Sequence, residues 1–371
     1  MEKSDRLLSL DVFRGLTIAG MIMVNNPGSW GSVYPALRHA VWHGVTPTDL
    51  VFPFFLFIVG VAITLSLTKR KERGDNQNKL ILNIIKRSFL IFLVGLILMG
   101  FPNFNLSTIR IPGVLQRIAV VYLIASIIFL KCSVRWQVIL TFAFLLVYWF
   151  LMTVIPVPGV GYANLEPATN LGAYFDNIIL NGHLWSGTKV WDPEGILSTM
   201  PAISTALSGI LLGHWLKTKY DDATKIIWMF VVGNFALLIS MFWDMVFPIN
   251  KGIWTSSYVM YTSGLALIIF AMCYWLVDVK KYTWWTKPLI VYGMNAIAVY
   301  FLSGIVARLL NLIEVTNSAG KVVAMKTYLF ESFFAPFFSP MNASLAWALA
   351  YVLFWLGMMW ILYWKKIFIK L

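Results

Sequence analysis

The sequence predicts an all-α protein: a polytopic integral membrane helical bundle with about 10–11 transmembrane helices. Of its 371 residues, 59% are hydrophobic and only 12% are charged, and the mean hydropathy is +0.76. A soluble domain would carry about 25% charged residues. The charges are therefore too few to cover a globular surface, and lipid must surround most of the chain. The long apolar runs also exclude an outer-membrane barrel, whose strands would alternate over about 10 residues.

Ten apolar segments are long enough to cross a bilayer, which takes about 20 residues in a helix. The third reaches that length only if its helix begins near Leu80, with Lys86 and Arg87 extending to the interface. A Phe-rich segment, residues 328–340, is broken by Pro336 and is either an interfacial or re-entrant piece or an eleventh span. The ten predicted spans are residues 7–24, 50–68, 88–101, 114–130, 136–155, 196–215, 226–247, 254–277, 288–309 and 345–364.

The basic residues predict the side of the membrane on which each loop lies. With the N-terminus inside, the inner loops and tails hold 20 of the 29 Lys and Arg, the outer segments 6 and the spans 3. Because basic loops stay in the cytoplasm, we expect cytoplasmic N- and C-termini and a multi-pass protein of a bacterial cytoplasmic (inner) membrane. The net charge of +13 is then explained by topology and by anionic membrane lipid, without a nucleic-acid partner. The inner set includes Lys3, Arg6 and Lys370.

Several charged residues fall within the predicted spans. Asp11 and Arg14 lie three residues apart in the first, where they can neutralise each other on one helix face, and they argue against a cleaved signal peptide. Arg117 and Asp244 lie about one turn inside two others. Since an unpaired charge in the membrane costs at least about 2.5–3.5 kcal/mol, all four should face the bundle interior. Either such groups fix helix packing, or Arg14 and Arg117 hold an anionic ligand.

The rest of the chain is uniform in character. It shows no internal repeat, no low-complexity segment and no soluble domain, so we expect residues 1–371 to form a single transmembrane domain. Cys132 and Cys273 both fall on or near the predicted cytoplasmic side, where no disulfide framework is expected.

Three long outer segments, residues 25–48, 156–194 and 311–343, interrupt the short loops, and three of the four histidines lie in the first two. The first contains His39, Trp42 and His43 shortly before Asp49. On a helix the two histidines, four residues apart, would share a face and could suggest zinc. No third ligand follows at a recognisable spacing, so we expect no metal. A general base is the better interpretation, because imidazole titrates near neutral pH. The outer side is therefore the expected active face.

Two acidic segments have an alternative structural explanation. Thr46, Pro47 and Asp49 form the pattern of a capping box for the second span. Asp49 can equally orient His39 and favour its protonated form, and both interpretations stay open. Asp192 and Glu194 similarly lie where they could cap the sixth span, with Asp192 as N-cap.

Several blocks of the chain resemble a known family. Residues 9–18 are similar to the opening of integral-membrane acyltransferases generally. The chain resembles the heparan-α-glucosaminide N-acetyltransferase family and its bacterial NagX-type relatives at residues 39–44, Thr46, 49–53 and Phe55. The blocks follow the family's order from residue 9 to about residue 300. Further matching blocks are residues 110–117, 192–195, 248–251, Trp254, 257–259 and 293–295.

The resemblance implies a reaction and roles for individual residues. Such enzymes move an acetyl group from cytosolic acetyl-CoA to the amine of a glucosamine beyond the membrane, an acyl-CoA-dependent N-acetyltransferase of the EC 2.3.1 type. The family's active histidine falls on His39, and its nearby asparagine on Asn25, with Asn26 adjacent. His43 stands where lysosomal members have Asn, so it is not expected to be essential. No large luminal domain is seen ahead of the first span, so a small amino sugar or cell-wall fragment is the expected acceptor.

The remaining candidate residues follow from the two substrates. The CoA nucleotide is too polar to cross, so it should stay at the inner face while its pantetheine arm reaches through the bundle, in contact with Arg14, Arg117 and Asn295. In the outer segments, the sugar is expected to contact indoles, which can stack on its ring, and nearby polar groups. The predicted acceptor contacts are Trp42, Trp185, Trp191, Asp192, Glu194 and Lys251.

His39 can serve in two ways. It can take the proton of the attacking amine while Asn25 stabilises the oxyanion, or it can carry the acetyl group transiently; we favour direct transfer. The alternative function is an amino-sugar transporter of the inner membrane, although the paired halves that are typical of transporters are not visible. The oligomeric state stays open and includes a homodimer.

Overall fold

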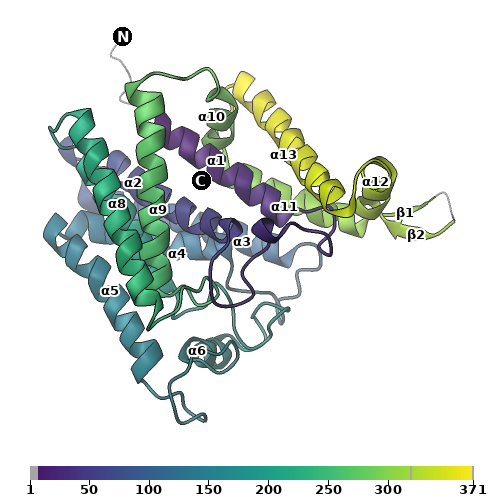
Figure 1. Ribbon diagram of the computed structural model, residues 1–371, viewed down its shortest axis with the longest axis horizontal. Helices are drawn as coiled ribbons and strands as arrows, with labels where there is room; N and C mark the ends of the chain where they lie inside the picture. The colour runs from purple at the N-terminus through teal and green to yellow at the C-terminus, as the bar shows by residue number, and fades with distance from the viewer. Residues whose placement is uncertain (1–6, 318–319, 370–371) are drawn as a thin grey trace. The chain divides into compact units, whose positions relative to one another are not determined.

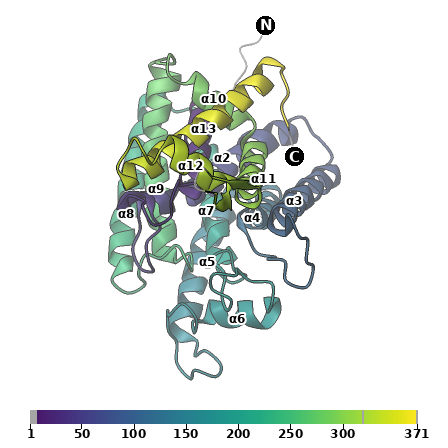
Figure 2. The ribbon, with the colours of Figure 1, turned by 90° about the vertical axis from the view of Figure 1, so that its right-hand side faces the viewer.

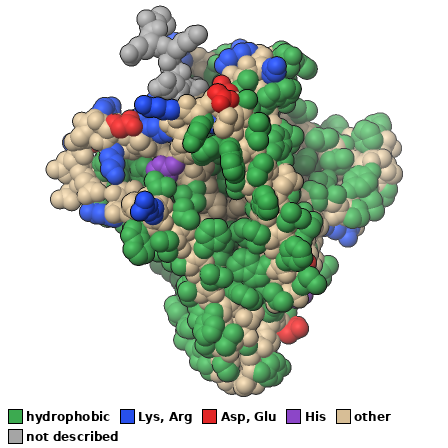
Figure 3. All heavy atoms as spheres, turned by 60° about the vertical axis from the view of Figure 1, so that its left-hand side comes forward, with side chains coloured by type: hydrophobic (Ala, Val, Ile, Leu, Met, Phe, Trp, Pro, Cys, Tyr) green, Lys and Arg blue, Asp and Glu red, His purple; other side chains and the backbone are tan. Residues whose placement is uncertain are grey.

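A computed structural model of the chain describes residues 7–317 and 320–369 (Figure 1). Lys3, Arg6 and Lys370, which entered the topology prediction, lie outside these residues. The described part forms thirteen α-helices and one short antiparallel hairpin, in which Glu314 pairs with Ala324 and Thr316 with Val322. The predicted all-α fold is confirmed, and apolar side chains predominate on the face shown in Figure 3.

Eight of the described helices are long and apolar enough to cross a membrane, and a bent pair would make nine. The third predicted span begins at Gln77, even earlier than the expected start near Leu80. The sixth predicted span forms α7, which is not one of these eight helices. The segment considered as an eleventh span forms only α12, whose 9 residues are too short to cross.

Contacts divide the described chain into two compact units. Unit 1 holds residues 7–39, 46–51, 276–317 and 320–369, and unit 2 holds residues 40–45 and 52–275. The chain enters unit 2 within α2 and leaves it within a π-helical segment, Tyr274–Val279.

Unit 1 is built on the first helix. Its elements are α1 (Leu8–Asn25), two 3-10 turns (Pro35–Leu37 and Pro47–Leu50), α10 (Lys287–Met294), α11 (Ala296–Leu312), β1 (Glu314–Thr316), β2 (Val322–Ala324), α12 (Met325–Phe333) and α13 (Pro340–Trp364). Helix α1 packs closely on α10, since a Cβ added at Gly15 would lie 1.8 Å from Leu289 O. Asp278 caps α1 by accepting from the N–H groups of Leu8 and Ser9 at 3.2 and 2.9 Å. Helix α13 packs on both α1 and α10 (Figure 1).

The predicted span at residues 288–309 is broken. Helices α10 and α11 meet at Asn295 with a bend of 81°. Sequence alone did not show this break, since neither Pro nor Gly stands at the junction itself, which is Met294–Asn295–Ala296.

Unit 2 holds most of the long helices. They are α2 (Val51–Glu72), α3 (Gln77–Gly100), α4 (Val114–Lys131), α5 (Val134–Val154), α6 (Leu171–Leu180), α7 (Thr199–Leu216), α8 (Asp222–Asp244) and α9 (Ser256–Cys273). Helix α8 packs along α9 and α3 packs along α4 (Figure 1). Helix α5 packs along α7. Small residues bring α2 against α7, because a Cβ at Gly60 would lie 1.9 Å from Ala206 O and one at Gly209 would lie 2.0 Å from Phe57 O.

The long segment after α5 is anchored by an apolar cluster in unit 2. Tyr148 and Met152 of α5, Leu171 of α6 and Ile253 are buried together there. The Tyr148 hydroxyl also donates to the Ile253 carbonyl. Helix α6, which begins at Leu171, is thereby fixed beside the end of α5 (Figure 2). Helix α6 carries Asp176, whose side chain takes part in the polar network of unit 2.

Candidate active site

His39 of unit 1 is paired with a buried carboxylate. Its Nδ1 lies 2.6 Å from Oδ1 of Asp49, and the His39 side chain is 47% exposed while that of Asp49 is 1% exposed. Because an ionised carboxylate can only accept, His39 Nδ1 is the donor to Asp49, and Nε2 is the ring nitrogen left for proton exchange. The arrangement orients the ring and stabilises an imidazolium. The predicted contact between His39 and Asp49 is therefore present in the structure.

The same carboxylate also forms the predicted capping box. Asp49 Oδ2 accepts from Thr46 N and Thr46 Oγ1, each at 3.0 Å, at the start of the 3-10 turn Pro47–Leu50 that leads into α2. Thr46 Oγ1 lies in addition 2.6 Å from the carbonyl oxygen of Arg38, the residue before the histidine. The two interpretations of Asp49 are thus not exclusive. One oxygen holds the turn and the other holds the imidazole.

Asn25 is the last residue of α1 and is exposed. Its neighbour Asn26, which directly follows the helix, donates from Nδ2 to Ile22 O of α1 at 2.8 Å. This bond commits the Asn26 amide to the helix end and leaves Asn25 as the better candidate for the family's asparagine. Its role in catalysis stays a prediction.

Arg14 and Asp11 form the pair expected from their spacing. Arg14 Nη1 lies 3.0 Å from Asp11 Oδ1 in unit 1, and the two side chains are largely buried. The pair neutralises both charges within the first span. A contact between Arg14 and CoA stays a prediction.

Asn295 lies in the bend between α10 and α11, and the C-terminal segment binds its side chain. Its Nδ2 donates to Ile367 O at 3.2 Å, and its Oδ1 accepts from Ile369 N at 2.8 Å. The predicted contact with CoA would require this segment to move.

The residues after His39 belong to unit 2 and are not helical. His39 and His43 therefore do not share a helix face, as their spacing would have allowed on a helix. Asn250 Nδ2 donates to His43 Nδ1 at 3.3 Å, and Gly44 N donates to Ile249 O at 2.7 Å. Within the described residues, no group of three or more His, Cys, Asp or Glu side chains is arranged to hold a metal ion.

Trp42 belongs to an aromatic group in the outer segments of unit 2. Its Nε1 donates to Leu165 O at 3.0 Å, and its ring meets Trp191 edge-on at 5.1 Å. Trp185 is 43% exposed, and the Arg110 guanidinium lies 5.9 Å from the centre of its ring. Lys251 lies in the turn between α8 and α9 and is half-buried. Of these indoles, Trp185 presents the most accessible face.

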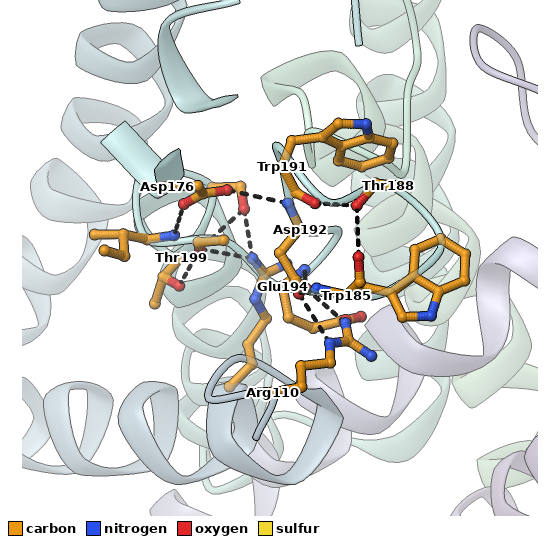
Figure 4. A network of polar contacts seen from close by, with 12 residues as sticks. Arg110, Asp176, Trp185, Thr188, Trp191, Asp192, Glu194 and Thr199 are labelled. Carbon is orange, nitrogen blue, oxygen red and sulfur yellow. Dashed lines mark hydrogen bonds and ion pairs between the residues drawn. The ribbon is translucent and has the colours of Figure 1, made fainter. Parts of the chain in front are cut away.

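A buried ion-pair network holds the second acidic segment of unit 2 (Figure 4). Arg110 donates from Nε to Asp192 Oδ2 at 2.8 Å and from Nη2 to Asp192 Oδ1 at 2.5 Å, and it reaches Glu194 Oε2 at 2.6 Å. Asp192 Oδ2 also accepts from Trp185 N at 2.9 Å. Burial lowers the pKa of Arg110, but the bonds to and charges of both carboxylates outweigh it and raise that pKa above its usual value.

The structure corrects the predicted role of Asp192 as a helix cap. Helix α7 begins at Thr199, and the residue before it is Ser198. Asp192 instead receives the forked guanidinium of Arg110, which a carboxylate matches with two parallel bonds. Its side chain is completely buried, and that of Glu194 is 8% exposed. Both therefore shape the segment, and direct binding of substrate by either residue stays a prediction.

Arg117 is fully enclosed at the beginning of α4. Its Nη2 donates to Gly195 O at 3.0 Å and to the Ser198 hydroxyl, and its guanidinium lies 5.1 Å from the centre of the Trp254 ring. Its Nε and Nη1 have no hydrogen-bond partner among the described residues. The predicted inward orientation is confirmed, and a ligand for the remaining donors stays a prediction.

Asp176 of α6 is a network residue that the sequence analysis missed. Its carboxyl accepts from Ile196 N at 2.8 Å and from Asp192 N at 3.2 Å. Burial raises the pKa of Asp176 to about 6, although the two backbone bonds and the charge of Arg117 lower it. The single acidic residue of a mostly apolar ten-residue helix was the signal that could have identified it.

Comparison with known proteins shows where these features belong. A sequence profile described as "Heparan-alpha-glucosaminide N-acetyltransferase, catalytic" matches residues 6–245. This match covers well over half of the chain and includes His39, Asp49 and the whole network of Figure 4. The chain belongs to the heparan-α-glucosaminide N-acetyltransferase family. The resemblance seen in the sequence is thereby confirmed.

Two mammalian members of this family are similar to the chain. Heparan-alpha-glucosaminide N-acetyltransferase of Mus musculus is 34% identical over a 353-residue alignment that covers 80% of this chain and 53% of the relative. The protein of the same name from Homo sapiens is 34% identical over 354 residues, covering 80% and 52%. The chain thus spans about half the length of the curated relatives it matches.

Proposed function

We propose that the protein is a multi-pass membrane acetyltransferase that moves the acetyl group of cytosolic acetyl-CoA to the amine of a glucosamine-type sugar on the other side of the membrane. Membership of the family and eight long apolar helices among the described residues support this proposal. The observation that carries it is the His39–Asp49 pair at 2.6 Å, because an oriented imidazole supplies the proton transfer that amine acylation needs.

The proposed step is direct. The sugar nitrogen attacks the thioester carbonyl and gives its proton to His39 Nε2, while Asp49 stabilises the resulting imidazolium. Asn25 is the proposed donor to the oxyanion. The carbon–sulfur bond then breaks, and the imidazolium returns the proton to the CoA thiolate. The products are an N-acetylated sugar and CoA with a free thiol.

The sequence pattern supports the proposed placement of the two substrates. The predicted inner loops are basic, which suits the phosphates of CoA on the cytoplasmic side. On the outer side, the exposed Trp185 ring suits the apolar face of a sugar. The proposed location is a bacterial inner membrane with both termini inside, and a small amino sugar is the proposed acceptor.

A coupled assay tests the proposal. Purified protein in detergent should release CoA from acetyl-CoA when glucosamine is present and far less without it. His39→Ala should remove this activity without loss of folding. The matched control is His43→Ala, which deletes an imidazole four residues away that binds Asn250. Equal loss in both variants, or release that is independent of the sugar, would contradict the proposal.

One observation favours a transporter as the second candidate. The 81° break between α10 and α11 resembles the interrupted helices that transporters use at the bilayer midplane. A transporter would accumulate labelled glucosamine in proteoliposomes without acetyl-CoA, whereas the proposed transferase would not.

A further inference from the structure

The segment that follows α1 carries His39, and part of it lies against the start of α13 (Figure 1). We call residues 26–39 the histidine loop. The loop and α13 both belong to unit 1. Helix α13 begins at Pro340, whereas the family profile matches residues 6–245 only. A helix outside the matched region therefore contacts the segment that carries the proposed base.

Ser344 of α13 is the main point of attachment for this loop. Its Oγ donates to the Ser29 carbonyl oxygen and accepts from Ser29 N, each at 3.1 Å. Its backbone carbonyl accepts from Gly28 N at 3.2 Å. Ser344 is only 2% exposed, so a loop group that lost its bond here would lie unpaired in a buried place. One residue of α13 thus holds three backbone groups of two successive loop residues.

The loop backbone fits closely against this part of unit 1 at Gly28. A Cβ there would lie 2.4 Å from the Phe330 ring of α12 and 3.0 Å from Cα of Ser344, so a larger residue would push the loop away from α13. A second attachment follows at Tyr34, whose hydroxyl donates to Asn342 Oδ1 at 2.5 Å. Two separate contacts with α13 fix both the position and the direction of the loop.

Arg38 connects the attached part of the loop to the histidine. Its Nε donates to Val33 O at 2.9 Å and its Nη2 to Gly31 O at 3.2 Å, both between the two attachments to α13. The Arg38 carbonyl lies 2.6 Å from Thr46 Oγ1, which donates to it. The residue before His39 is thus bonded both to the attached loop and to the turn that carries the partner carboxylate.

We propose that Ser344 is a positioning residue for acetyl transfer: it anchors the histidine loop on α13 and thereby holds the His39 ring in place for its substrates. The anchor stands on the hydrogen bonds within unit 1, and its effect on catalysis rests on the proposed function. A displacement of about 1 Å at a reacting group can slow a reaction about 10²-fold. Because Ser344 is not among the predicted contacts of either substrate, loss of the anchor should lower kcat and leave both KM values nearly unchanged.

Kinetics of Ser344→Ala in the full-length protein test this role. In detergent, kcat for CoA release with acetyl-CoA and glucosamine should fall about 10- to 100-fold per folded protein, with both KM values within about twofold of the wild type. Ser344→Thr keeps the hydroxyl and should restore most of kcat. The matched control Ser339→Ala removes an exposed hydroxyl that makes no capping bond at the start of the same helix. Equal kcat in Ser344→Ala and Ser339→Ala, or no recovery in Ser344→Thr, overturns the positioning role.

Amide hydrogen exchange tests the anchor without any need for activity. Residues 28–39 should exchange faster in Ser344→Ala than in the wild type or Ser339→Ala, because Ser29 N loses its acceptor. Unchanged exchange overturns the anchor. If Ser344→Ala does not fold, the exposed Asn342→Ala takes its place, and it should speed exchange of residues 34–39 or the proposal fails. If the wild type transfers no acetyl group while Ser344→Ala exchanges faster, the proposed function fails and the anchor stands.

Discussion

Replacing Asp49 by Asn should slow acetyl transfer strongly while leaving the fold intact. In the wild type, Asp49 Oδ1 accepts from His39 Nδ1 at 2.6 Å, which fixes the tautomer and stabilises the imidazolium. An Asn can present its amide nitrogen to Nδ1, which favours the tautomer with its proton on Nε2. In the Ser-His-Asp triad, the equivalent change lowers kcat about 10⁴-fold.

The expected magnitude here is smaller. The His39 side chain is 47% exposed, so water replaces part of the lost stabilisation. We expect kcat to fall about 10²-fold, equivalent to roughly 2.7 kcal/mol in the activation free energy. The assay is CoA release from acetyl-CoA with glucosamine, measured from pH 5 to 9, with thermal unfolding followed in the same detergent.

The matched control for Asp49→Asn is Thr46→Val. It removes the hydroxyl that contacts the Arg38 carbonyl and Asp49 Oδ2 but leaves the carboxylate on His39. It should cost about 1 kcal/mol of stability and lower kcat less than about tenfold. The reasoning is refuted if Asp49→Asn retains kcat within about twofold, or if Thr46→Val is the slower enzyme.

Three further changes test the packing and charges of unit 2. Arg110→Ala should lower the free energy of unfolding by about 3–5 kcal/mol, because Asp192 and Glu194 lose their buried cation; an unchanged Tm in detergent contradicts this. Because burial raises the pKa of Asp176 to about 6 in the fold, its protonated form stabilises the fold at low pH. This contribution, on the order of 3 kcal/mol, should be lost as the pH rises from about 4 to 6, with no further loss above pH 6. Comparing Tm against pH for the wild type and Asp176→Asn measures this difference, and parallel curves refute it. Gly60→Ala should destabilise unit 2, since the new Cβ would lie 1.9 Å from a backbone oxygen of α7; a Tm at or above that of the wild type refutes this packing.

The sequence was sufficient to predict the parts of the fold that depend on whether lipid or water surrounds the chain. Apolar runs of about 20 residues have one stable arrangement in lipid, and eight of the predicted spans appear as long apolar helices. The ends of helices and the breaks within them were harder to predict from the sequence. Helix α3 extends three residues before Leu80, and the bend at Asn295 has no Pro or Gly at the junction. Whether residues 1–371 form one acyltransferase domain stays a prediction.

The candidate site likewise has a part that the sequence predicted and a part that it did not. His39 and Asp49 are ten residues apart, and their contact followed from a local turn whose capping pattern is visible in the sequence. The partners of Arg110 and Asp176 are 16 to 84 residues away along the chain. Such contacts depend on how α6 and residues 185–196 pack, so local capping was the wrong explanation for Asp192. The family blocks at residues 110–117 and 192–195 marked both sides of this network without showing that they meet.

The proposed function requires that an acetyl group crosses the membrane to an amine with the help of His39. Proteoliposomes that contain the protein, labelled acetyl-CoA inside and glucosamine outside test it directly. Labelled N-acetylglucosamine should appear in the outer solution while CoA stays inside, and His39→Ala should give almost no product. Label that never leaves the lumen, or equal product from His39→Ala, would contradict it.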